Sequence, residues 1–474
     1  MIVFFRTIVS SIASFLLALI PLQSYTEGVV GQPQTFIPSN VVSHNERTIS
    51  QLIYRGLFKY DIYGVLIPDL AEMWTLSDEG LVYTIKLKEK QYWSNGQEIN
   101  ADDLIYTAYK IPDLKGVATD KVDDYTVRYT LPNRYAPFLN LLTVSILPNN
   151  TDEERSLKPI TSDDFKVGRV ERNGAIIKKV VLVTQKSEYP IRKIIFRYYT
   201  NEEELSNAAQ LGEIDGFMSQ NIHEELENYE NYRFPLQGIY FALYFNMRNE
   251  KFEDVELRKK LEKVLPIKQM IVNEGISVQG AISRGLFTDM ELEYDNYDPE
   301  FEEDLGELPI TLTVPDIDKH VRIAKVVKDI WEDRLEVSVV IRKIPPDELM
   351  SKVIEPRDFE LLLFGQEVSR DPDRYVIWHS TQVNYPGLNI TGFNHVRADR
   401  ALEEGRNELH NDYRTVHYKE FQRVLQEQTP IIFLYHPYQN FYVSNYIKGV
   451  GEKYTFTPVD RFLDFSNWER VKTN

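Results

Sequence analysis

Four short segments decide the fold: PDLAEMW at 68–74, SDEGLVYT at 77–84, WSNG at 93–96 and NADDL at 100–104. Residues 81–88 alternate apolar and polar side chains, which predicts a half-buried strand. Asn95-Gly96 predicts a turn, because this pair tolerates positive φ. Asn100 is expected to cap a helix whose first turn carries Asp102 and Asp103, where carboxylates suit the positive end of the helix dipole. A small α+β unit is therefore expected at about 44–150.

The segments on either side predict an α/β layer. Residues 25–31 suit a short strand, and apolar residues at 49, 52, 53 and 57 predict a helix over 49–58. Further on, Asn173-Gly174 predicts a hairpin that leads into 176–183. A strand at 191–199, a helix at 202–210 and another strand after Gly216 follow. This strand, helix, strand order favours a parallel layer.

The second half predicts another α/β unit. A buried strand is expected at 239–246 and a charged helix at 255–271. Strand, helix, strand and strand follow at 310–314, 321–333, 336–344 and 359–364. Helices are expected at 398–409 and 413–427, the second with an inward face of Tyr418, Phe421, Val424 and Leu425.

Composition excludes several classes of protein. The chain has 474 residues, 54 Lys and Arg against 72 Asp and Glu, a net charge of −18, and no Cys. The length allows two to four domains. No run of basic residues exceeds two or three, so nucleic-acid binding is not expected. The absence of Cys excludes zinc fingers, thiol catalysis, disulfides and lipoprotein anchoring.

Residues 1–22 indicate export. Arg6 is their only charge, and 8–22 is an unbroken run of apolar and small residues. A cleaved signal peptide and a retained anchor both remain open, and we favour the anchor because no Ala-x-Ala site follows. A buried N-terminal helix is the less favoured alternative. We therefore expect an extracytoplasmic protein, periplasmic or at the cell surface, held at the membrane by residues 1–22.

No catalytic or metal-binding signature is present. The sequence lacks nucleophile elbows, phosphate loops, dinucleotide fingerprints and the His-Glu-x-x-His motif. The eight His residues are scattered, so neither a metal site nor a cofactor is expected. Carboxylates such as Glu367 and Asp371 could serve a glycosidase, but such pairs are common in an acidic chain. The acidic run 288–318 lacks the spacing of a calcium loop and favours a solvated linker.

The four opening segments together resemble the family 5 extracellular solute-binding proteins of ABC transporters, the oligopeptide- and dipeptide-binding group. They follow that family's pattern P-x-L-A-x-x-W, S-x-D-G-x-x-Y-T, W-S-D-G and T-A-x-D-V in order and at similar spacing. Other segments resemble it in the expected order: LGEID at 211–215, Phe245-Asn246 with Asp254-Val255 and Arg258, Asp371-Pro372-Asp373 with Trp378-His379-Ser380, and Arg414, Tyr418, Gln422 and Pro430.

The resemblance implies an α/β, two-lobe periplasmic-binding-protein type II fold, with an extra α+β domain and a hinge between the lobes. Residues 1–24 would be the anchor or signal peptide. Lobe I would comprise 25–43, 160–237 and 438–474, the extra domain 44–159, and lobe II 238–437. The implied function is solute capture between the lobes and delivery to permease subunits, by a monomer.

The resemblance also implies which residues face the cleft: Ser43, His44, Trp93, Asn246, Gly365, Gln366, Glu367, Arg370, Asp371 and Tyr435. Trp93 and Asn246 have a local alternative, the support of a turn and a strand. Peptide binders of this family usually carry an Asp for the peptide amine three residues before the Asp-Pro, and this chain has Val368 there.

Four possibilities follow from the presence of Val368. Glu367 or Asp371 replaces the missing Asp, or the ligand has no free amine at that place, since a buried ammonium without a carboxylate is costly. Arg370 could instead hold a ligand carboxylate. Alternatively, Glu367, Arg370 and Asp371 could simply be charged residues of a solvated loop.

Two hypotheses of function follow. The first is a transport binding protein for a peptide or a related polar solute. The second is an extracytoplasmic enzyme or a non-transporting surface receptor on the same fold, which stays open because fold does not determine function.

Overall fold

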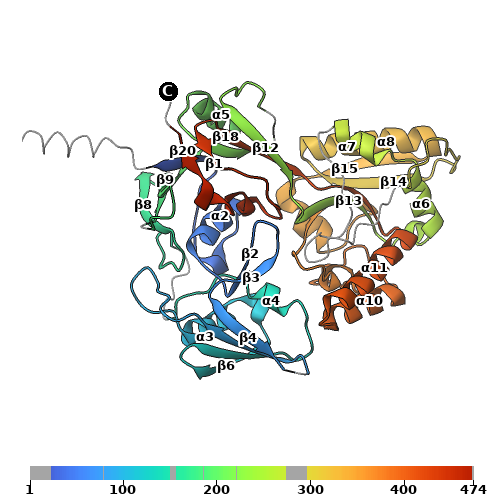
Figure 1. Cartoon of the computed structure of the whole chain (residues 1–474). Coiled ribbons are helices and arrows are strands. Elements are labelled where there is room, and N and C mark those ends of the chain that lie inside the picture. The colour runs from blue at the N-terminus through green and yellow to red at the C-terminus, as the bar shows by residue number, and fades with distance from the viewer. Residues whose placement is uncertain are drawn as a thin grey trace, which may run out of the picture.

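The computed structural model describes residues 23–471 except 78, 150–155, 185, 220, 222 and 274–295. Within these residues the strands form sheets of seven, five and four strands and two short ribbons. The seven-stranded and five-stranded sheets belong to two units that lie side by side, and the four-stranded sheet lies below the first of them (Figure 1). The expected strand at 25–31 is β1 (Ser24–Val30).

The seven-stranded sheet has β1 near its middle. Its order is β12 (Tyr229–Pro235), β18 (Tyr438–Ser444), β11 (Gly216–Ser219), β1, β10 (Lys193–Tyr199), β9 (Ile176–Val183) and β8 (Lys166–Asn173). β1 runs parallel to both β10 and β11, and α5 (Glu202–Gln210) connects those two strands. The predicted hairpin, helix and parallel layer are therefore confirmed.

The four-stranded sheet contains the segments that open the sequence analysis. Its order is β4 (Ala71–Leu76), β5 (Val82–Leu87), β7 (Thr126–Thr130) and β6 (Ala118–Asp123). A hairpin of β2 (Phe58–Tyr60) and β3 (Leu66–Pro68) precedes it. α3 (Ala101–Lys110) begins at the predicted cap, Asn100, with Asp103 completing a capping box.

The predicted helix over 49–58 is wrong in its bounds. α2 runs over His44–Ile53, and Tyr54 is already extended. Ser43 and Glu46 form a capping box, which starts the helix five residues before the apolar stripe. Leu57, the last residue of the apolar stripe, lies in the extended segment after α2 and is buried in the core.

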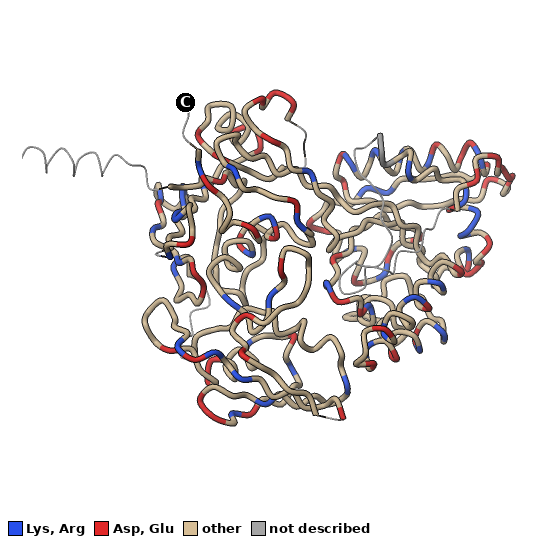
Figure 2. Tube along the Cα trace, viewed as in Figure 1, with Lys and Arg blue, Asp and Glu red and all other residues tan. Residues whose placement is uncertain are grey.

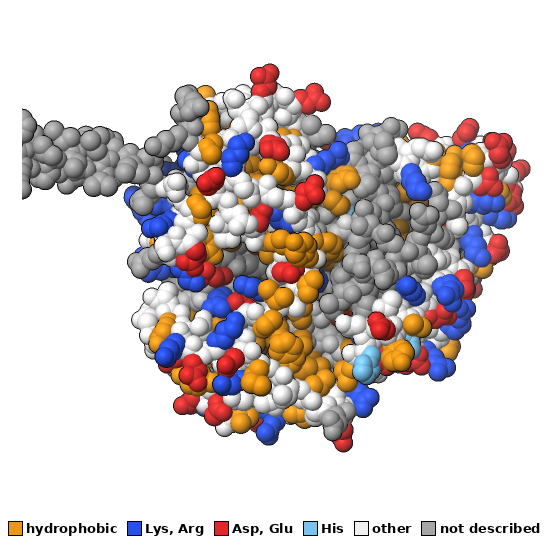
Figure 3. Space-filling view, viewed as in Figure 1, with side chains coloured by type: hydrophobic (Ala, Val, Ile, Leu, Met, Phe, Trp, Pro, Cys, Tyr) orange, Lys and Arg blue, Asp and Glu red, His pale blue; other side chains and the backbone are white. Residues whose placement is uncertain are grey.

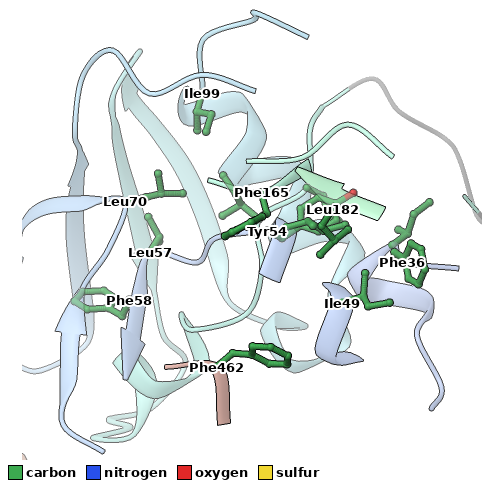
Figure 4. Close-up of a cluster of buried hydrophobic side chains, with 14 of the residues drawn as sticks. Phe36, Ile49, Tyr54, Leu57, Phe58, Leu70, Ile99, Phe165, Leu182 and Phe462 are labelled. Atoms are coloured by element: carbon green, nitrogen blue, oxygen red, sulfur yellow. The ribbon is translucent and has the colours of Figure 1, made fainter. Parts of the chain in front are cut away.

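One continuous core joins the seven-stranded and four-stranded sheets. Phe58 and Leu70 from the region of the small sheets lie in the same cluster as Leu182 from β9 and Phe462 from the C-terminal segment (Figure 4). The two sheets are therefore held together by shared apolar burial rather than by a linker.

The five-stranded sheet has a helical layer on each face. Its order is β15 (Ser338–Ile344), β14 (Pro309–Pro315), β16 (Leu361–Glu367), β13 (Ile239–Phe245) and β17 (Ile431–Tyr435). One face packs on α6 (Val255–Lys263) and α8 (Asp318–Leu335), and the other on α10 (Val396–Asn407) and α11 (Asn411–Gln428). The four residues predicted to face inward from α11 are buried.

The helix predicted over 255–271 is two helices. α6 ends at Lys263, and α7 (Ile267–Asn273) begins after Pro266. Proline has no N–H for the helix ladder and restricts the residue before it, which explains the break.

The acidic run predicted as a linker is partly structured where it is described. Asp298 pairs with Lys263 (3.2 Å) and Glu303 with Lys260 (2.6 Å), and β14 occupies 309–315. Across the described ranges, no group of three or more His, Asp or Glu could hold a metal ion.

Two short segments connect the units that carry the large sheets. β12 leads through 236–238 into β13, and β17 leads through 436–437 into β18. The Leu236 N–H donates to the Pro437 carbonyl (3.0 Å), and His436 Nδ1 lies 2.7 Å from the Ile239 carbonyl oxygen. These adjacent crossings have the form of a two-strand hinge. The exact domain boundaries remain predictions.

The expected anchor, residues 1–22, lies outside the described residues. Among the helices that are described, none is both long and apolar enough to span a bilayer.

Candidate functional site

The hinge-side edge of the five-stranded sheet collects several predicted site residues. Ile239, the first residue of β13 after the hinge, pairs with Glu367 at the end of β16. Since β14 and β15 run parallel to β16, their carboxyl ends lie at this same edge. In open α/β sheets ligands bind beyond the carboxyl ends of the strands. The edge is therefore the candidate site.

Gly365, Gln366 and Tyr435 also lie at this edge. Phe241 of β13 is opposite both Gly365 and Tyr435 and stacks on the Tyr435 ring (centroids 4.9 Å apart, planes at 15°). A Cβ on residue 365 would lie 2.7 Å from the Phe241 ring. A side chain at residue 365 would therefore have to displace the Phe241 ring.

The start of α2 faces this edge from the other unit. Ser43 caps α2 by accepting a hydrogen bond from the Glu46 N–H (3.2 Å), and His44 is the first helical residue. Arg47 Nη1 lies 2.9 Å from Glu367 Oε1, with side chains 36% and 52% exposed. Burial lowers the pKa of His44, and the negative charge of Glu367 partly opposes that shift. The structure thus brings Ser43, His44 and Glu367 together.

Arg370 and Asp371 already have protein partners. Arg370 pairs with Asp460 and lies over the rings of Tyr60 (4.4 Å) and Phe456 (4.9 Å). Asp371 accepts two hydrogen bonds from Arg414 (2.8 and 3.1 Å) and one from Asn140 Nδ2 (3.1 Å). These contacts favour a structural role for both residues over the predicted contact with ligand charges.

Trp93 and Asn246 lie away from the candidate site. Trp93 is buried in the core around the four-stranded sheet, and its indole N–H donates to Asp103 (3.0 Å). The Asn246 amide donates to the carbonyls of Phe359 (2.8 Å) and Arg357 (3.2 Å) just after β13. Both environments favour the local alternative, support of a turn and of a strand end.

Sequence reasoning missed the first turn of α8. Lys319 Nζ lies 5.2 Å from the Tyr435 ring centroid, and the His320 ring lies 4.9 Å from that of Phe241. His320 is buried, and its Nδ1 has no hydrogen-bond partner among the described residues. Burial, helped by Lys319, lowers the pKa of His320 to about 4, so its imidazole is neutral at pH 7.

This turn is suited to an anionic group. The residue before α8, Ile317, makes no side-chain cap hydrogen bond, and Asp318 places one carboxylate in the first turn. The positive end of the helix dipole and the Lys319 ammonium both favour negative charge there. The predicted helix started at 321, and this late start explains why the two residues were missed.

A family model matches one part of the chain. The model described as Bacterial extracellular solute-binding proteins, family 5 Middle, matches residues 65–274. This part of the chain is similar to that family. Among the curated relatives is the oligopeptide-binding protein AppA of Bacillus subtilis, 22% identical over 94% of this chain and 91% of the relative.

Solved structures confirm the predicted two-lobe, type II periplasmic-binding-protein fold. AppA from B. subtilis in complex with a nonapeptide has a TM-score of 0.72 and 20% identity, over 95% of this chain and 100% of that one. NikZ from Campylobacter jejuni in complex with Ni(L-His) has a TM-score of 0.74 and 21% identity, over 95% and 100%.

The departure from the family pattern at Val368 places a buried apolar residue at that position. Val368 is buried among apolar side chains next to the α10 and α11 layer, and its N–H donates to the Gly238 carbonyl in the hinge (2.9 Å). No carboxylate stands at this position to receive an ammonium, and the neighbouring Glu367 is the acid most open to solvent on the loop.

Proposed function

We propose that this chain is the extracytoplasmic solute-binding component of an ABC importer. It captures a peptide or a related polar solute between its lobes and delivers it, as a monomer, to membrane permease subunits. The observation that carries this proposal is the Arg47–Glu367 pair, which joins α2 to the end of β16 in the other unit, directly beside the two-strand hinge. Such a pair lies where closure would enclose a ligand.

The relatives support a peptide or similar solute. The curated relative is named for oligopeptides, and the two solved structures hold a nonapeptide and a nickel–histidine complex. All three ligands are rich in carboxylate, amine or amide groups. We therefore infer a polar solute with at least one carboxylate and leave its length open.

We infer that the ligand carboxylate binds at the first turn of α8. Lys319 supplies the charge and neutral His320 a hydrogen bond, above the stacked rings of Phe241 and Tyr435. A ligand amine would have to use Glu367 and displace Arg47, since Asp371 is held by Arg414. Arg47 is then free to meet a second anionic group.

Ligand binding by thermal shift and calorimetry tests this proposal. We expect a peptide pool, or a solute recovered from the native protein and identified by mass spectrometry, to raise the melting temperature. Lys319→Gln should weaken binding about tenfold, the value of one lost charge-assisted hydrogen bond. Lys325→Gln, an exposed site further along α8, is the matched control. No shift with any peptide or small polar solute would overturn the proposal.

The geometry disfavours hydrolysis by Glu367 and Asp371. A glycosidase needs one carboxylic acid and one carboxylate free to approach the same bond. Here Asp371 is buried between Arg414 and Asn140, and Glu367 points to Arg47. Binding without turnover is the function that the geometry supports best.

A further inference from the structure

The segment that forms β8, β9 and β10 has an unusual charge for this chain. Between Lys166 and Arg197 the sequence carries nine Lys or Arg and two Glu, in a protein whose net charge is −18. The basic residues are scattered singly or in pairs, so the sequence shows no continuous cluster. The concentration becomes visible only when the strands pair.

Strand pairing places these residues in rows on one face. In the first row Lys193 lies opposite Val183, which lies opposite Lys166. A second row joins Ile195, Val181 and Arg169, and a third joins Arg197, Lys179 and Glu171. Every one of these side chains is partly or fully exposed, whereas Ile194, Leu182 and Val167 in the alternate row are buried. We call the exposed residues of these strands the basic face.

Few carboxylates neutralise the basic face. Glu171 lies 3.4 Å from Arg169 and 3.6 Å from Lys179, and Arg197 pairs with Glu213 (2.9 Å). Lys186 pairs with Asp164. In the part of the chain that the structure describes, no ion pair involves the remaining five basic residues, Lys166, Arg172, Lys178, Arg192 and Lys193.

The basic face lies beside the point where the N-terminal residues join the fold. Ser24, the first residue of β1, is in register with Lys193, and the Arg192 N–H donates to the Gln23 carbonyl (3.1 Å). Residues 1–22 are apolar apart from a few small polar residues and Arg6. Lys and Arg gather along the β8 and β9 edge, on the side away from the five-stranded sheet (Figures 2 and 3).

We propose that the basic face binds an anionic membrane surface. Basic residues held near such a surface each contribute to binding within about one Debye length, roughly 8 Å at physiological salt. One apolar chain segment holds a protein at a bilayer more firmly when a basic patch adds a second signal. An anionic lipid surface is favoured over an acidic protein because the apolar residues 1–22 precede Gln23 and Ser24, which adjoin Arg192 and Lys193 at one end of the basic face.

The hairpin tip adds an apolar contact to the basic face. Ile176 follows the Asn173-Gly174 turn and is 51% exposed. Lys178, two residues further along β9, is exposed as well, and so is Arg172 on the partner strand. An apolar side chain near exposed cations suits a headgroup layer, where the cations meet phosphates and the apolar group lies below them.

Vesicle co-sedimentation of the full chain tests the proposal. We expect the apolar residues 1–22 to bind neutral and anionic bilayers alike. The informative quantity is therefore the ratio of the affinities for phosphatidylglycerol-containing vesicles and for pure phosphatidylcholine vesicles. We expect a preference of at least about tenfold for the anionic vesicles at low salt, falling as salt rises to ~0.5 M. The variant K166Q/R172Q/K178Q should lose most of this preference and keep its binding to the neutral vesicles.

A second triple variant controls for net charge. Lys115→Gln, Arg128→Gln and Lys325→Gln remove three exposed basic residues elsewhere on the protein, and we expect them to leave the lipid preference unchanged. Equal loss in both variants, or an unchanged preference in the first, would overturn the proposal. So would binding of the basic face to soluble polyglutamate without any preference for anionic vesicles. Unchanged melting temperature of the first variant verifies its fold.

Discussion

Arg414 of α11 holds Asp371 through two hydrogen bonds, and both side chains are almost fully buried, at 2% and 3% exposure. Asn140 of α4 (Phe138–Leu141) donates a third hydrogen bond to the same carboxylate. The loop that follows β16 is therefore fixed both to its own helical layer and to the region of the four-stranded sheet. A buried carboxylate with this many partners supports a loop rather than exchanging them for a solute.

Asp371→Asn should destabilise the protein by about 3–5 kcal/mol, because Arg414 would remain buried without its counter-charge. Urea denaturation measures the change. Glu427→Gln is the control, since Glu427 pairs with Arg397 at the surface and its loss should cost less than about 1 kcal/mol. Equal small losses from both substitutions would show that the buried pair is not structural.

Trp93→Phe should cost about 1–2 kcal/mol of unfolding free energy and leave ligand affinity unchanged. The substitution removes the indole N–H that donates to Asp103, the residue that also accepts from the Asn100 N–H at the start of α3. Thermal denaturation and calorimetry on the same preparation separate the two effects. A tenfold loss of affinity without a loss of stability would instead indicate that Trp93 contacts the ligand.

Gly365→Ala should weaken ligand binding, because the added Cβ would displace the Phe241 ring from its stack on Tyr435. We expect at least a fivefold loss of affinity, together with a destabilisation of about 1–3 kcal/mol from overpacking. Gly451→Ala serves as the control, since the nearest atom to its Cβ would be at an ordinary 3.4 Å. Unchanged affinity in Gly365→Ala would place the ligand elsewhere.

His320 should make the protein less stable in acid. Its pKa is about 4 in the fold against 6.5 when exposed, so the unfolded chain binds its proton more readily. Its contribution is complete above pH 6.5 and is lost as the pH falls toward 4, by up to about 3 kcal/mol. Denaturation at a series of pH values should show that His320→Gln removes this part of the acid dependence. An exposed control, His410→Gln, should retain it.

Local patterns in the sequence predicted the elements well where one residue decides the geometry. The Asn173-Gly174 turn, the Asn100 cap and the inward face of α11 are all where the pattern placed them. Pro266 breaks a helix that periodicity alone had continued. These features depend on neighbours within a few residues, which is the range that periodicity and capping rules describe.

The candidate site was harder to predict because its charges find partners far along the chain. Glu367 meets Arg47 and Arg370 meets Asp460, across 320 and 90 residues. A loop with three charges has the same sequence whether those charges are solvated, paired or bound to ligand. The basic face was hard to predict for the same reason, since single cations on three strands become neighbours only through the pairing of those strands.

The position of β1 has a consequence for how the protein folds. β1 pairs with β10 and β11, and β11 in turn needs β18, more than 400 residues after β1. The first strand to emerge therefore waits longest for its sheet, while residues 239–435 contain all five strands of the other. Non-local pairing of this kind folds slowly and leaves strand edges open to aggregation. The chain is thus expected to depend on a holding chaperone until its last strands are synthesised. Truncation after β17 should unfold the unit that contains the seven-stranded sheet.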